Sequence, residues 1–179
     1  MVSFSYFNAI FCNIVIYNYK GGGSGFIGTR LVKHLTGQGY EVTVVSRMPG
    51  LKRITWHQLE KDGVPKGVTA VVNLAGQNVL DPSRRWTAGF KQNVWNSRIN
   101  SSAALVKAIE SAPDVKAFVN ISGVSLYPPN DNKVYIESDQ GENFDFMSKL
   151  CLEWEKAATL PPQVAAKTRG VSENVFISN

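Results

Sequence analysis

A glycine cluster near the start of the chain, residues 21–28, has the spacing that most clearly predicts chemistry. It satisfies Gly-x-Gly-x-x-Gly through Gly23, Gly25 and Gly28, and Gly-x-x-Gly-x-x-Gly through Gly22 and the same last two. Glycines allow a tight turn and a close backbone approach to a pyrophosphate, and the following helix directs its N–H groups at the phosphates. A plain turn is the alternative interpretation. The predicted dinucleotide contacts are Gly22, Gly23, Ser24, Gly25, Phe26, Ile27 and Gly28.

The choice of dinucleotide depends on the residues that end the next predicted strand, Val44-Val45-Ser46-Arg47. A site for NAD usually has an acidic residue there, about 20 residues after the glycines, to bind the ribose 2′-hydroxyl. Here Arg47 occupies that place. A guanidinium can bind a 2′-phosphate through two hydrogen bonds, and Ser46 can add a hydroxyl donor. We therefore predict NADP as the cofactor, held by Ser46 and Arg47, with a plain surface arginine as the alternative.

The elements that would position these residues alternate between strand and helix. Apolar and β-branched runs predict strands at residues 13–17, 40–45, 53–56, 68–74 and 115–121. Helical spacing of apolar residues follows the glycines up to Gly37 and Gly39, and recurs at 87–111 and 144–159. Such alternation predicts an α/β fold, a Rossmann-type doubly wound parallel sheet with helices on both faces.

Composition excludes several other classes. The net charge of +5 comes from scattered Lys and Arg residues without a basic run, so we expect no nucleic-acid partner. Cys12 and Cys151 form no Cys-x-x-Cys pair, and His34 and His57 are isolated, so we expect neither a zinc site nor a disulfide framework.

The apolar stretch at residues 1–19 contains no Lys or Arg, unlike the basic start of a signal peptide. Asparagines interrupt it, and it is shorter than the ~20 residues that span a bilayer. We expect no membrane segment and a cytoplasmic location, with mitochondria as the alternative.

Three segments together resemble a known superfamily. Gly-Gly-Ser-Gly-Phe-Ile-Gly, Val-Thr-Val-Val-Ser-Arg and Val-Val-Asn-Leu-Ala-Gly-Gln-Asn-Val are similar to short-chain dehydrogenase/reductases, in the atypical extended branch of epimerase-family proteins. The resemblance covers roughly residues 21–160. It implies cofactor contacts at Asn73, Leu74, Ala75, Gly76 and Arg98. Asn73 as a strand-end cap and Arg98 as a solvated helix residue remain the alternatives.

The same resemblance implies a Tyr-x-x-x-Lys pair for proton transfer, and here the sequence departs from it. Lys149 matches the lysine, but Asp145 stands at the tyrosine position, and Gly123 at the usual serine position. Ser122 and Ser125 flank that glycine. The candidate proton-transfer residues are therefore Ser122, Ser125 and Lys149, in an eroded Ser-Tyr-Lys site.

Both ends of the chain differ from the family pattern. We assign residues 13–160 to the NADP-binding domain, 1–12 to a divergent N-terminal segment and 161–179 to a divergent tail without a convincing sixth strand. The sheet is expected to be incomplete at its C-terminal end, as in a truncated isoform.

Two functions remain open from sequence. One is an NADP-dependent oxidoreductase or epimerase-like protein acting on an unidentified carbonyl or nucleotide-sugar substrate. The other is a non-catalytic NADP-binding or redox-sensing module. The sequence predicts no oligomeric state.

Overall fold

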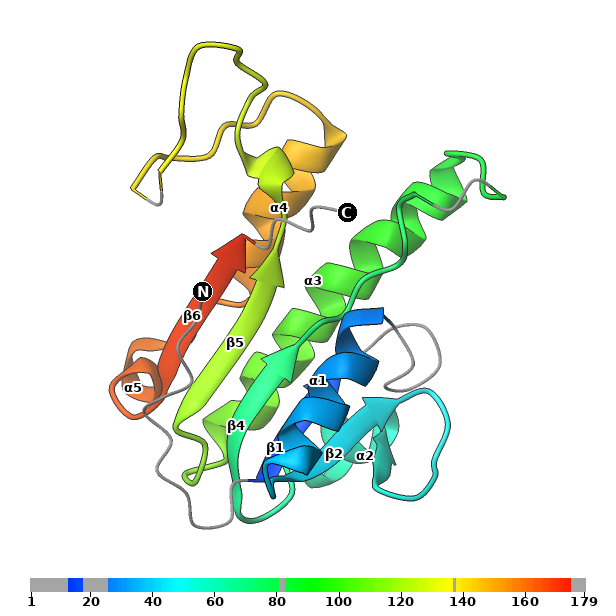
Figure 1. The fold of residues 1–179 in the computed structure, drawn as a ribbon, viewed down its shortest axis with the longest axis vertical. Helices are drawn as coiled ribbons and strands as arrows, with labels where there is room; N and C mark the ends of the chain where they lie inside the picture. Colours follow the sequence, from blue (N-terminus) through cyan, green and yellow to red (C-terminus); the bar gives the residue numbers. More distant parts are fainter. Residues whose placement is uncertain (1–12, 18–25, 81–82, 137, 175–179) are drawn as a thin grey trace.

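Strands and helices alternate along the chain in a single α/β arrangement (Figure 1). The computed structural model describes residues 13–17, 26–80, 83–136 and 138–174. Gly22 to Gly25 therefore lie outside the described residues. The elements are β1 (Asn13–Tyr17), α1 (Phe26–Gly37), β2 (Glu41–Ser46), β3 (Arg53–Thr55), α2 (Trp56–Asp62), β4 (Val68–Asn73), α3 (Ala88–Glu110), β5 (Ala117–Ser122), the 3₁₀ turn η1 (Val124–Leu126), α4 (Phe146–Ala157), α5 (Pro162–Ala165) and β6 (Arg169–Asn174).

The sheet has the order β3-β2-β1-β4-β5-β6, and each neighbouring pair is parallel. Chain order therefore reverses beside β1, because β2 lies on one side of it and β4 on the other. In open parallel sheets, ligands bind at such a switch point, beyond the carboxyl ends of the strands. The arrowheads in Figure 1 mark that edge. The predicted Rossmann-type fold is confirmed.

Successive residues of each strand face opposite sides of the sheet, and this divides the core in two. Val44 and Val72 pack with Leu35 of α1 on one face. Val45 and Val71 lie on the other face, in a cluster formed with residues of α2, α3 and the α4–α5 region. The near-continuous apolar runs of β2 and β4 are thus explained by burial on both faces.

Helix boundaries follow local capping. Thr87 caps α3, with its side chain accepting from the N–H of Phe90, as the predicted start at residue 87 requires. Gly39, with φ of +87°, makes the left-handed turn after α1. Helix α2 was not predicted, although Thr55 and Gln58 form a capping box that is visible in the sequence as Thr-x-x-Gln.

The prediction that the tail lacks a sixth strand is wrong. Strand β6 pairs with β5 from Ala117↔Arg169 to Ser122↔Asn174. Its sequence, Arg-Gly-Val-Ser-Glu-Asn, has no apolar alternation. The strand forms without this pattern because it pairs with β5 through backbone hydrogen bonds. The buried Thr168 helps to place it by donating to the carbonyl of Val115 at 2.8 Å.

Candidate functional site

Of the predicted phosphate loop, only the part that begins α1 lies within the described residues. Phe26 begins α1, and Ile27 and Gly28 lie in its first turn. Gly28 is buried. A buried glycine here fits close packing of the helix against the sheet, the third role expected of the motif. The phosphate contacts themselves remain predictions.

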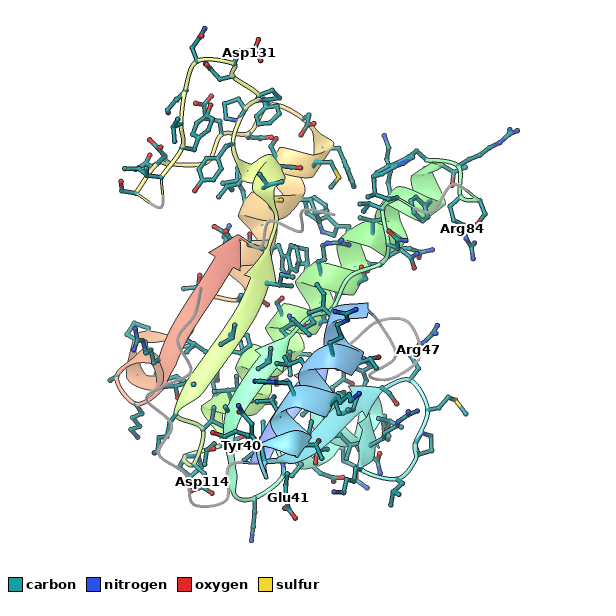
Figure 2. The ribbon with its side chains drawn as sticks, viewed as in Figure 1. Tyr40, Glu41, Arg47, Arg84, Asp114 and Asp131 are labelled. Atoms are coloured by element: carbon teal, nitrogen blue, oxygen red, sulfur yellow. The ribbon has the colours of Figure 1, made fainter. Side chains whose placement is uncertain are left out.

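The two predicted cofactor residues at the end of β2, Ser46 and Arg47, differ in their exposure. Ser46 is buried, and its hydroxyl donates to the carbonyl of Met48, so this donor is used within the turn. Arg47 is exposed. Figure 2 shows it beyond the end of β2, with Glu41 at the other end of the strand.

Arg47 borders a cavity of about 300 Å³ between α2 and α3. The wall combines one aromatic ring, several amides and hydroxyls, one cation and one carboxylate: Arg47, Trp56, Glu60, Asn93, Asn96, Ser97, Asn100, Ser101 and Ala104. An aromatic ring can stack on a nucleobase, and amides can bind its polar edge. Sequence reasoning missed this cavity because its residues come from two helices separated along the chain.

Asn73 ends β4 in full burial and organises the loop that follows. Its Oδ1 accepts from the N–H of Ala75 at 3.0 Å, so it does cap the strand end. Its Nδ2 donates to Ser102 of α3 at 2.9 Å and to Asn120 of β5 at 2.6 Å. Ala75 is also buried, and Leu74 is half-buried. Asn73 and Ala75 are thus buried at the carboxyl end of β4, and their cofactor contacts remain predictions.

Two further buried side chains complete this network, and neither was predicted as a site residue. The hydroxyl of Ser102 donates to Oδ1 of Asn120 at 3.1 Å, and the indole N–H of Trp154 donates to Ser102 at 3.1 Å. The network joins β4, β5, α3 and α4 at one point. Buried polar groups need such partners, since an unmatched one costs about 1–3 kcal/mol.

Arg98 of α3 reaches the loop after β4. Its Nη1 donates to the carbonyl of Gln77 at 3.2 Å, and the guanidinium lies over the Trp154 ring, 5.1 Å from the centroid. A Cβ at Gly76 would stand 3.0 Å from Nη2 of Arg98, so a side chain there would require the guanidinium to shift. Burial lowers the pKa of Arg98 to about 10, and no carboxylate among the described residues offsets it. An arginine half-buried in this way is not a plain surface residue.

Ser122 ends β5 and is also buried. Its hydroxyl donates to Oε1 of Glu155 at 2.6 Å, which joins the strand to α4. Ser125 lies half-buried in η1. Sequence reasoning selected both serines but missed Glu155 as the partner, because 33 positions separate it from Ser122.

The model of the NAD dependent epimerase/dehydratase family matches residues 21–158. The chain belongs to this family. It is 49% identical over 142 residues to the epimerase family protein SDR39U1 of Homo sapiens, covering 79% of this chain and 48% of the relative. An epimerase family protein of Staphylococcus aureus is 31% identical over 168 residues, covering 88% and 54%. The chain spans about half the length of the curated relatives it matches.

Solved structures agree with this assignment. The crystal structure of human SDR39U1 isoform 2 with NADPH superposes with a TM-score of 0.81 and 44% identity, covering 89% of this chain and 52% of that one. A nucleoside-diphosphate sugar epimerase from Corynebacterium glutamicum gives a TM-score of 0.71 at 21% identity, covering 92% and 34%, which shows a shared fold.

The position of the superfamily tyrosine carries a structural role in this family member. The carboxylate of Asp145 accepts from the N–H of Ser148 at 2.7 Å and caps α4. This hydrogen bond lowers the pKa of Asp145, so the group stays ionised at neutral pH and holds no proton to donate. The Lys149 side chain is exposed, and none of the described residues forms a hydrogen bond or ion pair with it. The structure therefore does not bring Lys149 together with Ser122.

Gly123 stands where the resemblance places a serine, and the space beside it holds the sulfur of a residue from another element. A Cβ at Gly123 would lie 2.7 Å from Sγ of Cys151 in α4. Cys151 is buried, and burial raises the pKa of its thiol to about 11, which leaves it protonated and unreactive at neutral pH. A serine at 123 would therefore require the Cys151 thiol to move.

The described residues contain no cluster of His, Cys, Asp and Glu able to hold a metal ion. Among them, no helix is both long and apolar enough to cross a membrane.

Proposed function

We propose that this chain is the NADP(H)-binding domain of an oxidoreductase or epimerase-like protein acting on a carbonyl compound or nucleotide sugar. The observation that carries the proposal is Arg47, which follows β2 without an acidic residue and borders the cavity beside α3. An acid at this point would favour the NAD ribose, whereas a guanidinium favours a 2′-phosphate. Support also comes from human SDR39U1, whose crystal structure contains NADPH.

The residues present fit the cofactor at two places. The cavity bordered by Arg47 offers Trp56 and the α3 amides to an adenine ring. Arg98, a cation without a carboxylate partner in the described structure, offers charge to an anionic group beside Gly76. Bound NADP supplies hydride transfer, and the protein's part is to orient it and to hold the proton.

A non-catalytic NADP-binding or redox-sensing module is the second candidate. It is favoured by Asp145, which caps a helix where the superfamily has its tyrosine. Both candidates bind the cofactor, so turnover distinguishes them.

The experiment has two parts. Thermal melts of the purified chain with and without NADPH test for binding, because a ligand that binds only the folded state raises the melting temperature. Gly25→Val is the control, since a branched side chain would occupy the space expected for the pyrophosphate. A raised melting temperature in wild type but not in Gly25→Val is expected. An equal rise in both would show that the glycine segment is only a turn.

The second part follows NADPH absorbance during incubation with a panel of carbonyl compounds. Substrate-dependent oxidation favours the enzyme. Binding without oxidation favours the sensing module.

A further inference from the structure

The side chains of Ser122 and Glu155 form an acid–alcohol contact at the ligand edge of β5. Ser122 is the last residue of the strand, and Glu155 approaches it from the third turn of α4. The separation of 2.6 Å is in the range of a charge-assisted O–H···O⁻ bond. Ser122 is buried, whereas Glu155 is half-buried, so Glu155 also has access to water.

We propose that Glu155 accepts the reaction's proton through the Ser122 hydroxyl, and that the group oxidised is an alcohol. The inference rests on the proposed function, because NADP+ is the hydride acceptor. Because Ser122 already donates its hydrogen to Glu155, its oxygen is left as an acceptor. An acceptor at this edge suits a substrate O–H group and not a carbonyl oxygen.

One hydride and two protons move in this step. The substrate carbon loses hydride to NADP+, and the substrate O–H bond breaks as its proton passes to Oγ of Ser122. At the same time the proton of Ser122 passes to Oε1 of Glu155. The products are a carbonyl compound, NADPH and a protonated Glu155, which then releases its proton to water.

The other ionisable groups near this edge are unsuited to the role. Asp145 accepts from the α4 backbone, and the exposed Lys149 side chain has no hydrogen-bond partner among the described residues. The Cys151 thiol on α4 interacts electrostatically with Glu155, and the Arg98 guanidinium on α3 interacts with that thiol. Neither contacts Ser122 by a hydrogen bond among the described residues. Glu155 acts through Ser122 and is therefore a positioning residue for the proton.

The test uses Glu155→Gln, Ser122→Ala and the control Glu153→Gln. A glutamine at 155 still accepts the Ser122 hydrogen bond through its amide oxygen but cannot take up a proton, so the fold is kept. Glu153 lies on the same helix and only contacts Lys156, 3.9 Å away at the surface. Each variant is first checked by a thermal melt and by NADP+ titration. We expect melting temperatures close to that of wild type and NADP+ dissociation constants within twofold of it.

The first readout needs no turnover. Infrared difference spectra between wild type and Glu155→Gln isolate the Glu155 carboxylate band in the cofactor-free chain. We expect Ser122→Ala to shift this band, because the carboxylate loses its 2.6 Å donor. A band unchanged by Ser122→Ala would overturn the proposal.

The second readout is NADPH formation from NADP+ with cyclohexanol, 1-phenylethanol and glucose as probes. We expect wild type and Glu153→Gln to turn over at least one alcohol, and Glu155→Gln to fall about 100-fold or more, the usual value of general base help. The dependence of the NADPH formation rate on pH in wild type should be lost in Glu155→Gln.

Full activity in Glu155→Gln would overturn the proposal, and so would wild type that binds NADP+ but oxidises none of the probes. Absence of NADP+ binding in wild type would overturn the proposed function itself. The titration reads that failure separately.

Discussion

Two regions of the same sheet edge differ in how many of the expected superfamily features they contain. Around β2, β1 and β4, the expected cofactor-binding features are kept: Arg47 after β2, the buried Gly28, and Gly76 beneath Arg98. Around β5 and α4, the two positions that the resemblance assigns to the reacting serine and tyrosine have other contacts: Gly123 faces the Cys151 sulfur, and Asp145 caps a helix. The buried Asn73 network joins the two regions.

The largest expected effect is the loss of that network. Asn73→Ala removes the acceptor of the Ala75 N–H and the donor to Ser102 and Asn120, and leaves buried groups unpaired. We expect the free energy of unfolding to fall by about 2–4 kcal/mol. Urea denaturation measures it. The control Asn130→Ala loses one exposed loop contact and should change stability by less than ~1 kcal/mol. An equally small change in Asn73→Ala would mean that the two regions are not joined there.

The next effect concerns Gly123. Introducing a hydroxyl by Gly123→Ser places a Cβ 2.7 Å from the Cys151 sulfur and should destabilise the protein by about 1–3 kcal/mol. The second substitution Cys151→Ala removes the sulfur, so the double variant should regain most of that stability. Gly89→Ser is the control, because its Cβ would meet nothing within 4 Å. Additive losses of stability in the double variant would show that the side chains at the two positions do not clash.

A smaller effect separates binding from stability at Arg98. The cation is desolvated without a carboxylate partner among the described residues, so the neutral, unbranched Arg98→Met should leave stability unchanged or slightly raised. The affinity for NADPH should fall about tenfold, because one charge-assisted hydrogen bond contributes ~1.5–3 kcal/mol. Melts and fluorescence titration give the two values. If stability fell and affinity stayed, Arg98 would be a structural residue.

Much of the fold could be predicted because its signals are local. Helix α3 begins at the expected residue because Thr87 caps it, and β4 reads as a buried strand because both faces are covered. Strand β6 could not be predicted, since its partner is the backbone of β5 and its own side chains carry no pattern.

The candidate site was predictable only where one motif contains the whole feature. Arg47 could be selected from its place after a strand, and Arg98 from the family resemblance. Glu155, Cys151 and Ser102 could not, because each acts on a residue of another element through a contact that only folding creates.

The central claim is that the cofactor region is kept and selects NADP, and fluorescence titration of NADPH and NADH tests it most directly. Arg47 should bind the 2′-phosphate that only NADPH carries, so wild type should bind NADPH about tenfold or more tightly than NADH. Arg47→Ala should weaken NADPH binding to the NADH value while leaving NADH unchanged. Equal affinities of wild type for the two cofactors would contradict the account.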